Sequence, residues 1–301
     1  MPDSDDSSVE ADADPVDRFV TRFAPSPSGL LHRGHALSAL TAFEAARAAG
    51  GRFLLRIEDI DAERCRPEFE AAILEDLAWL GLEWERPVRR QSDHLGDYRA
   101  ALQRLRDTGL VYRCFRTRGE VLDEIARAPH GPGPAPFRGG PLPSAEEAVR
   151  LERGEPYAWR LSLDAARSHL GRSYDLMAFL QIPPPTEDTD FEIIPAQPEA
   201  AGDVVLARKG IGVAYHLAVV VDDALQGVTQ VIRGEDLSEA THIQVLLQKL
   251  LGLPTPAYRH HALLLRPDGK RYAKRDTAET LRALRDSGVT AAQLRRELGF
   301  S

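Results

Sequence analysis

The chain has 301 residues, of which 43% are hydrophobic, so it can bury the core of one large domain or of two smaller ones. No run approaches the roughly 20 apolar residues that a membrane-spanning helix needs. The first residues also lack the basic and then apolar pattern of a secretory signal, so the sequence predicts a cytoplasmic protein. Two cysteines are too few for a disulfide framework.

The formal net charge of -8 argues at first against a nucleic-acid partner, but it is unevenly distributed. Residues 1–17 carry seven Asp and Glu and no basic residue, which predicts a disordered, solubilising tail. Without these seven, 39 of the 46 acidic residues remain against 38 Lys and Arg. From Arg259 to the end, ten Lys and Arg outnumber five Asp and Glu, so a basic C-terminal face is available for phosphates.

The first predicted elements form a strand, helix, strand unit. Residues 18–24, RFVTRFA, have the composition of a buried strand, and an amphipathic helix follows RFAPSPSGLLHRGH and ends at Gly50. Residues 52–57, RFLLRI, are a second strand that ends in an acidic cluster. Parallel strands joined by one helix cross over right-handedly, and such sheets bind ligands beyond the carboxyl ends of their strands.

Two helices and a long loop follow. Pro67 suits the first turn of a helix that ends at Gly81. Ser92 is the expected N-cap of a helix that continues to Gly109. Residues 128–144 contain so much proline and glycine that they predict a surface loop within an inserted subdomain.

The last third of the chain returns to sheet character. Val, Ile and Leu runs broken by turn residues predict strands over residues 203–237, and Ser238 is the expected N-cap of a helix that ends at Gly252. A strand, HALLLRP, is expected to begin at His261. Two short helices then open with capping boxes, Asp276-x-x-Glu279 and Thr290-x-x-Gln293. This order predicts an α/β protein whose parallel sheet is interrupted mid-chain and followed by small basic helices.

The turn before the first helix contains two glycines and two histidines. Free backbone N–H groups and the helix macrodipole attract an anion there, most simply a nucleotide phosphate. Gly29 and Gly34 would let a ligand approach the backbone, and His32 and His35 are three residues apart, on one face of the first turn. A metal pair and a plain capping role are the alternatives, and no third metal ligand has a suitable spacing nearby.

Two separate segments resemble the signatures of class I aminoacyl-tRNA synthetases. PSPSGLLHRGH resembles the histidine-x-glycine-histidine motif after the first strand of their Rossmann-type nucleotide-binding fold, and KRYAKR, Lys270 to Arg275, resembles their mobile lysine loop. Alone, KRYAKR would be interpreted as a solvated charge run. The pairing is much more specific, because one motif is near the start of the sheet and the other near its end, as in the family.

The resemblance is closest within the glutamate-specific branch. RFAPSPSG and LLRIEDIDAERCRPEF are similar to that branch, and the similarity extends from Arg22 to about Arg285. Its short members activate glutamate without tRNA and attach it to the queuosine base in the anticodon of tRNA(Asp). The chain stops 26 residues after Arg275, so we expect the short form, without the helical region that reads a glutamate anticodon.

The resemblance implies a set of site residues. A buried glutamate site must offer cations to the carboxylates and an anion to the ammonium. The expected glutamate-binding residues are Arg22, Ala24, Ser26, Glu58, Tyr215 and Arg233. The expected ATP-binding residues are His32, Gly34, His35, Arg271, Lys274 and Arg275, of which His32, His35 and Lys274 would be catalytic. The alternatives are structural salt bridges for Arg22, Glu58 and Arg233, and ordinary packing for Tyr215.

ATP and Mg²⁺ are the implied cofactors, and zinc is expected to be absent. Many members of the family hold zinc through Cys-x-Cys and a later Tyr-x-x-x-Cys, but here the first pair is Cys114-Phe115-Arg116, and Phe137 and Pro141 are the best candidates for the second. His130 could assist Cys114, but two ligands do not make a structural site. Packing of the proline-rich loop would then hold the subdomain. The lysine loop also departs from the family, with Tyr272-Ala273 before Lys274.

A monomer is expected, and two alternative functions stay open: a truncated glutamyl-tRNA synthetase that charges tRNA(Glu), and a non-catalytic paralogue that binds tRNA. The expected divisions are an acidic tail (1–17), the first half of the nucleotide-binding domain (18–110), an inserted subdomain (111–202), the second half (203–262), and a segment with the lysine loop and the C-terminal helices (263–301).

Overall fold

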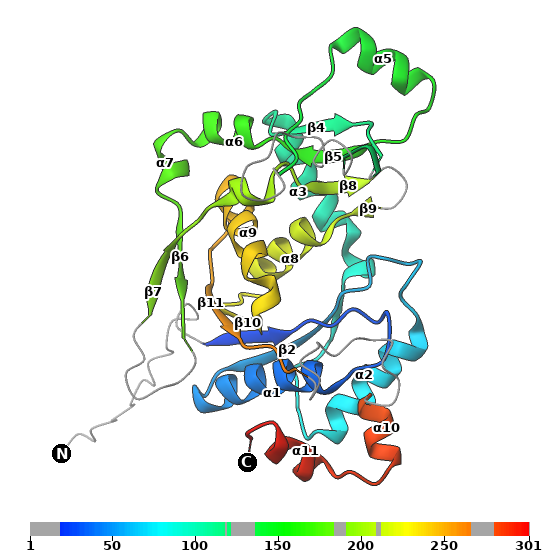
Figure 1. Cartoon of the computed structure of the whole chain (residues 1–301), viewed down its shortest axis with the longest axis vertical. Coiled ribbons are helices and arrows are strands. Elements are labelled where there is room, and N and C mark those ends of the chain that lie inside the picture. Colours follow the sequence, from blue (N-terminus) through cyan, green and yellow to red (C-terminus); the bar gives the residue numbers. More distant parts are fainter. Residues whose placement is uncertain are drawn as a thin grey trace, which may run out of the picture.

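A parallel sheet covered by helices on two sides forms the body of the protein (Figure 1). The computed structural model describes residues 19–117, 119–121, 136–183, 191–208, 212–265 and 280–300. The expected α/β class is confirmed. The acidic tail and KRYAKR lie outside the described residues.

Two parallel groups of strands make this layer. In the first group, β1 (Val20–Phe23) pairs with β2 (Arg52–Ile57), which pairs with β3 (Arg89–Arg90). In the second group, β10 (Gln230–Gly234) pairs with β11 (Ala257–His261), which pairs with β6 (Ala178–Gln181). β7 (Glu192–Pro195) extends the second group as an antiparallel strand.

Hydrogen bonds at the start of β1 join the two groups. The Thr229 N–H donates to the Val20 carbonyl at 2.9 Å, and the Val20 N–H donates to the Thr229 hydroxyl at 2.9 Å. β1 therefore lies beside β10. Within each group these strands are parallel, apart from β7. The carboxyl ends of β1, β2 and β10 meet at one edge of the layer, where ligands bind in folds of this kind.

Two apolar cores lie on the two faces of the layer, and the strands alternate between them. In β2, Leu54 belongs to one core, whereas Phe53 and Leu55 belong to the other. The first core includes residues from α3 (Leu95–Asp107), α8 (Tyr215–Leu225) and α9 (Ser238–Leu251). The second includes residues from α1 (Arg33–Ala48), α2 (Pro67–Trp79), α10 (Leu281–Asp286) and α11 (Ala291–Glu297).

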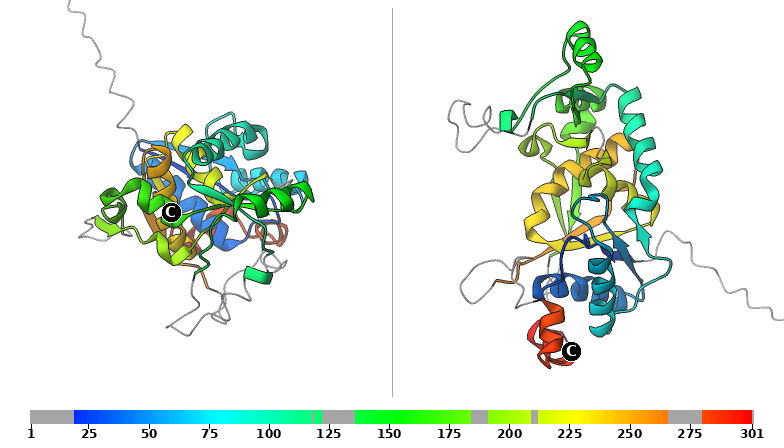
Figure 2. Two further views of the ribbon diagram at one scale, coloured as in Figure 1. Left: turned by 90° about the horizontal axis from the view of Figure 1, so that it is seen from above. Right: turned by 90° about the vertical axis from the view of Figure 1, so that its right-hand side faces the viewer.

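The C-terminal helices are anchored on α1 and α2 (Figure 2). Leu281 and Leu294 are fully buried in the second core. Arg295 pairs with Glu44 at 2.5 Å, and the predicted capping box of Thr290 and Gln293 is confirmed. The other predicted box, Asp276 with Glu279, lies outside the described residues, and α10 begins at Leu281 with Thr280 as its N-cap.

A second sheet is antiparallel and forms the upper part of the molecule in Figure 1. It contains β4 (Val111–Cys114), β5 (Ala158–Leu161), β8 (Val205–Arg208) and β9 (Gly212–Val213), in that order. The helices α5 (Ser144–Glu152), α6 (Leu163–Leu170) and α7 (Arg172–Asp175) lie between its strands in the sequence. Figure 2 shows that α5 projects from the end of the molecule opposite to α10 and α11.

The expectation of strands throughout residues 203–237 was wrong in its middle part, because α8 occupies Tyr215–Leu225. From Leu217 to Val221 every residue is buried, so the helix shows no amphipathic period. A short apolar run that is rich in valine cannot be distinguished from a strand by periodicity.

Three predicted boundaries also differ. Ser92 is not the cap of α3 but lies in the 3₁₀ helix η2 (Gln91–His94) that leads directly into it. Ser238 is the first residue of α9 rather than its cap, because the 3₁₀ turn η4 (Glu235–Leu237) precedes it. The strand expected to begin at His261 instead ends there, as β11, whose sequence AYRHH contains too many polar residues to show a strand pattern.

Asp203 holds the loop around Phe137 onto the antiparallel sheet. One carboxylate oxygen accepts hydrogen bonds from the Tyr112 hydroxyl at 2.8 Å and the Gly139 N–H at 2.9 Å, and the other accepts from the Leu163 N–H at 3.1 Å. Burial, and then the charge of Asp203, raises the pKa of Tyr112 above its ordinary value.

Two positions of the expected zinc motif lie within the described residues. Phe137 is buried beneath the Arg160 guanidinium, 4.5 Å from its ring centre, and Cys114 is buried with Tyr112 and Val121. Because His130 lies outside the described residues, the expected absence of zinc stays a prediction. No helix within the described residues is long and apolar enough to cross a bilayer.

We predict that Asp203→Ala lowers the free energy of unfolding by about 3 kcal/mol, because three buried donors lose their acceptor. Urea denaturation measures the change. Asp164→Ala, which removes an exposed carboxylate from the same region, should change it by no more than about 0.5 kcal/mol. Equal effects of the two substitutions would contradict the role of Asp203.

Candidate active site

The strand ends and the first turn of α1 enclose a cavity of about 320 Å³. Most of the residues predicted to bind glutamate or ATP line it, although they are up to two hundred residues apart in the sequence. These are Arg22, Ala24, His32, Gly34, His35, Glu58, Tyr215 and Arg233.

The two histidines form the cap of α1. The Gly34 N–H donates to Nδ1 of His32 at 3.1 Å, and the His32 N–H donates to Nδ1 of His35 at 3.1 Å. The rings stack with centres 3.8 Å apart. Because both Nδ1 atoms accept hydrogen bonds, each neutral ring carries its proton on Nε2. The two histidines therefore cap α1, as the capping alternative proposed, and each ring still carries an Nε2–H donor.

Gly34 packs closely against the His32 ring. A Cβ atom at this position would lie 3.1 Å from that ring, so a larger residue requires the ring to shift by a few tenths of an ångström. The ring lies at the helix N-terminus, where backbone N–H groups and the macrodipole favour an anion.

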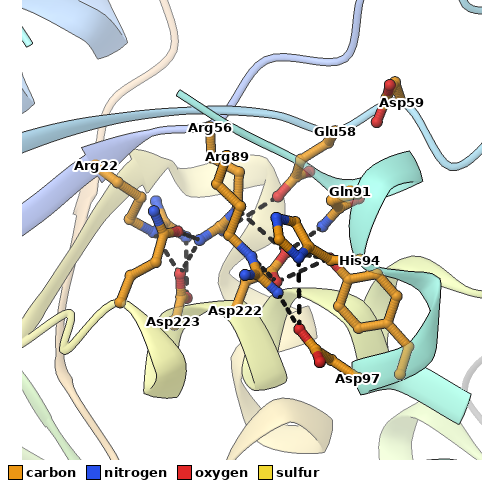
Figure 3. A network of polar contacts seen from close by, with 12 residues as sticks. Arg22, Arg56, Glu58, Asp59, Arg89, Gln91, His94, Asp97, Asp222 and Asp223 are labelled. Carbon is orange, nitrogen blue, oxygen red and sulfur yellow. Dashed lines mark hydrogen bonds and ion pairs between the residues drawn. The ribbon is translucent and has the colours of Figure 1, made fainter. Parts of the chain in front are cut away.

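Arg22 and Arg56 share one buried carboxylate (Figure 3). Arg22 donates to both oxygens of Asp223, at 3.0 and 3.3 Å, and Arg56 donates to Oδ1 at 2.8 Å. Burial alone would raise the pKa of Asp223, but the charges and hydrogen bonds of the two arginines outweigh it and hold that pKa below its ordinary value. Asp223 therefore stays ionised and fixes both guanidinium groups.

Arg56 also holds Glu58. Its side chain is fully buried and lies 3.2 Å from the Glu58 carboxylate. Burial raises the pKa of Glu58 above its ordinary value, although the charges of Arg56 and Arg22 oppose this. An added positive group beside Glu58 would stabilise its ionised form.

Asp222 anchors the other side of this network (Figure 3). It accepts hydrogen bonds from Arg89 at 2.7 Å, from Gln91 at 2.8 Å and from the Tyr98 hydroxyl at 2.8 Å. These donors come from β3, η2 and α3. Asp222 therefore ties α8 to the edge of the parallel sheet.

Asp59 fixes the start of η2 next to Glu58. Its carboxylate accepts hydrogen bonds from the Ser92 N–H at 2.8 Å and from the Ser92 hydroxyl at 2.6 Å. The carboxyl end of β2 and the first turn of η2 are thus joined directly.

Arg233 has a different environment. Its side chain donates to the Thr241 hydroxyl at 2.7 Å, to the Tyr215 hydroxyl at 3.4 Å and to Nε2 of His260 at 3.3 Å. All of these partners are neutral groups. Arg233 itself is only 5% exposed.

The other predicted site residues do not line the first cavity or lie outside the described residues. Ser26 lines a second cavity of about 790 Å³, which shares Glu58 and Tyr215 with the first. Arg271, Lys274 and Arg275 lie outside the described residues.

The chain after these residues returns to the histidine turn. Thr280 forms a β-bridge with His32, and the Leu281 N–H donates to the Leu31 carbonyl at 2.8 Å. Leu263 and Leu264, which precede the undescribed stretch, line the first cavity. Described residues on both sides of that stretch therefore lie at the site.

The sequence profile of tRNA synthetases class I (E and Q), catalytic domain, matches residues 18–299. The chain belongs to this family. It is a ligase of the aminoacyl-tRNA synthetase type, and the resemblance noted in its sequence is confirmed.

Individual relatives agree with this assignment. A Rhodobacter capsulatus protein named glutamyl-Q tRNA(Asp) synthetase is 49% identical, covering 94% of this chain and 100% of that protein. A Nocardia farcinica protein of the same name is 45% identical, covering 91% of this chain and 81% of that protein. The crystal structure of a glutamate tRNA ligase from Elizabethkingia meningosepticum, in complex with its amino acid, matches with a TM-score of 0.65 and 28% identity. That match covers 86% of this chain, which spans about half (52%) of the solved one.

Several site residues of this synthetase-family chain were not predicted from its sequence. Asp222 and Asp223 interrupt the apolar run LAVVVDDAL, and Arg56 interrupts LLRI. A charged residue within an apolar run was the sequence signal that could have identified these three residues. Thr241 and His260 gave no such signal, because only the fold brings them to Arg233.

We predict that Asp223→Asn lowers the free energy of unfolding by about 3 kcal/mol at neutral pH, because two buried arginines lose a shared negative charge. The pKa of Asp223 is depressed in the folded state, so its contribution is present above the unfolded value of about 3.9 and is lost as pH falls through the folded value. Urea denaturation from pH 3 to 8 should show a constant difference between variant and parent above about pH 5, shrinking in acid. A difference that does not shrink would contradict this account.

Proposed function

We propose that the protein activates L-glutamate with ATP in the absence of tRNA and then transfers the glutamyl group to the queuosine base in the anticodon of tRNA(Asp). The observation that carries the glutamate assignment is Arg233, a buried cation with neutral partners in the same cavity as Arg22 and Glu58. The acceptor assignment is supported by the names of the relatives that share up to 49% identity with this chain.

In the first step, an oxygen of the glutamate α-carboxylate attacks the α-phosphorus of ATP. The bond from that phosphorus to the bridging oxygen breaks, and pyrophosphate leaves with the electron pair. Such a transfer depends on positioning and charge stabilisation more than on covalent help from the protein. Mg²⁺ bound to ATP would offset the charge of its phosphates.

The protein groups have distinct parts in this scheme. Glu58 receives the substrate ammonium, whose positive charge favours the ionised carboxylate that burial disfavours. Arg22 and Arg233 receive the substrate carboxylates, and Tyr215 donates a hydrogen bond. The Nε2–H groups of His32 and His35 donate to phosphate oxygens at the N-terminus of α1.

In the second step, a hydroxyl of the acceptor nucleoside attacks the acyl carbon, and AMP leaves. The second cavity is suited to admit that nucleoside, because it adjoins the glutamate-binding cavity at Glu58 and Tyr215. Its volume of about 790 Å³ is within the range of small-molecule pockets.

We predict ATP–pyrophosphate exchange that depends on glutamate and needs no RNA. In a charging assay, labelled glutamate should be incorporated into queuosine-containing tRNA(Asp) but not into tRNA(Asp) without queuosine. Labelling of tRNA(Glu) instead would support the alternative of a synthetase that charges tRNA(Glu). Binding of tRNA without any exchange would support the non-catalytic alternative.

We predict that Lys274→Ala reduces the exchange rate at least about a hundredfold while glutamate binding changes little, because one phosphate-binding cation is lost. Lys274 lies outside the described residues, and Thr280, six residues after it in the sequence, forms a bridge with His32. Isothermal titration with glutamate and exchange assays separate the two effects. Lys249→Ala, which removes a lysine near the end of α9, is the matched control. An unchanged exchange rate would remove Lys274 from the mechanism.

A further inference from the structure

The hydrogen-bond partners of Arg233 are all uncharged, and so is its aromatic neighbour. The guanidinium contacts the hydroxyls of Thr241 and Tyr215 and the His260 ring, and it lies 5.5 Å from the centre of the Tyr258 ring. No carboxylate of the described part of the chain lies within ion-pair distance of it, whereas Arg22, Arg56 and Arg89 all have carboxylate partners.

The carboxylates that share the cavity with Arg233 are engaged elsewhere or are exposed. Glu58 pairs with Arg56, and Asp236 lies on the exposed turn η4. A buried charge without a counter-ion is costly, so this arrangement favours a ligand that brings a negative charge.

His260 is held as a neutral acceptor. Its Nε2 accepts from Arg233, so its proton is on Nδ1, which donates to Oε1 of Gln181 at 2.9 Å. Burial, and then the charge of Arg233, lowers the pKa of His260 to about 4. The Thr241 hydroxyl, 3.1 Å from Nε2, accepts from Arg233 and donates to His260. Arg233 is thus oriented from β11, α9 and β6 without being neutralised.

We propose that His260 is a specificity-determining positioning residue, which fixes Arg233 through a neutral acceptor so that its whole positive charge is left for a carboxylate of the amino-acid substrate. This inference rests on the proposed glutamate activation. It explains how the site selects glutamate over glutamine: an amide would leave the buried guanidinium charge uncompensated, while a carboxylate compensates it. A site built around a buried polar partner discriminates strongly against a ligand that lacks the matching group.

The test compares His260→Gln with His260→Glu. Both side chains can place an oxygen near the position of Nε2, and they differ mainly in charge. The assay is ATP–pyrophosphate exchange, with KM and kcat measured for glutamate, glutamine and ATP, and thermal unfolding measured in parallel.

His260→Glu should raise the KM for glutamate at least about thirtyfold relative to His260→Gln, leave the KM for ATP similar in both, and reduce the preference for glutamate over glutamine. Its melting temperature should equal or exceed that of His260→Gln, because Arg233 gains a counter-ion. A purely structural role for His260 predicts equal KM values in the two variants, and that result would overturn the inference.

Thr241 provides a second, independent comparison should either His260 variant fail to fold. Thr241→Asp should raise the KM for glutamate well above that of Thr241→Asn, and equal values would again overturn the inference. Failure of the proposed function is distinguishable, because the unsubstituted protein would then show no glutamate-dependent exchange at all.

Discussion

The site depends on the two adjacent aspartates of α8, which enter a buried layer that already contains three arginines. Asp223 joins Arg22 to Arg56, and Asp222 joins Arg89 to Tyr98 and Gln91. Charges of one sign cannot be buried together without counter-ions. The strand ends and α8 therefore depend on each other for charge compensation in the folded protein.

Within this layer, the positive charge of Arg233 is not compensated by a carboxylate of the described residues. Arg22 and Arg56 form ion pairs with Asp223, whereas Arg233 is oriented by neutral groups of Thr241, His260 and Tyr215 and has no carboxylate partner among the described residues. Such a group is a preorganised electrostatic receptor, because its geometry is fixed before the ligand arrives. Arg22 and Glu58 take part in ion pairs within the protein, and the glutamate-binding roles of Arg22, Glu58 and Arg233 stay predictions.

The histidine turn shows how one pair of side chains can serve both the helix and a ligand. Each imidazole accepts a backbone N–H through Nδ1, which fixes the ring and leaves its proton on Nε2. The same contacts explain the close approach of Gly34. Since Thr280 bridges to His32, the start of α10 is tied to the same turn.

The sequence by itself determined the first strand, helix, strand unit, the histidine turn, the helix start at Pro67, the helix ends before Gly81, Gly109 and Gly252 and the capping box at Thr290, because these follow from local periodicity, turn residues and capping chemistry. It also determined the family, since two signatures at the right separation are specific. It could not determine that Tyr215–Leu225 is a helix, because a helix buried on all sides has no polar face. Only the tertiary structure decided which arginine has a counter-ion. Asp223 and Arg22 are two hundred residues apart, and His260 and Arg233 lie on different strands, so their pairing depends on the order of strands in the sheet.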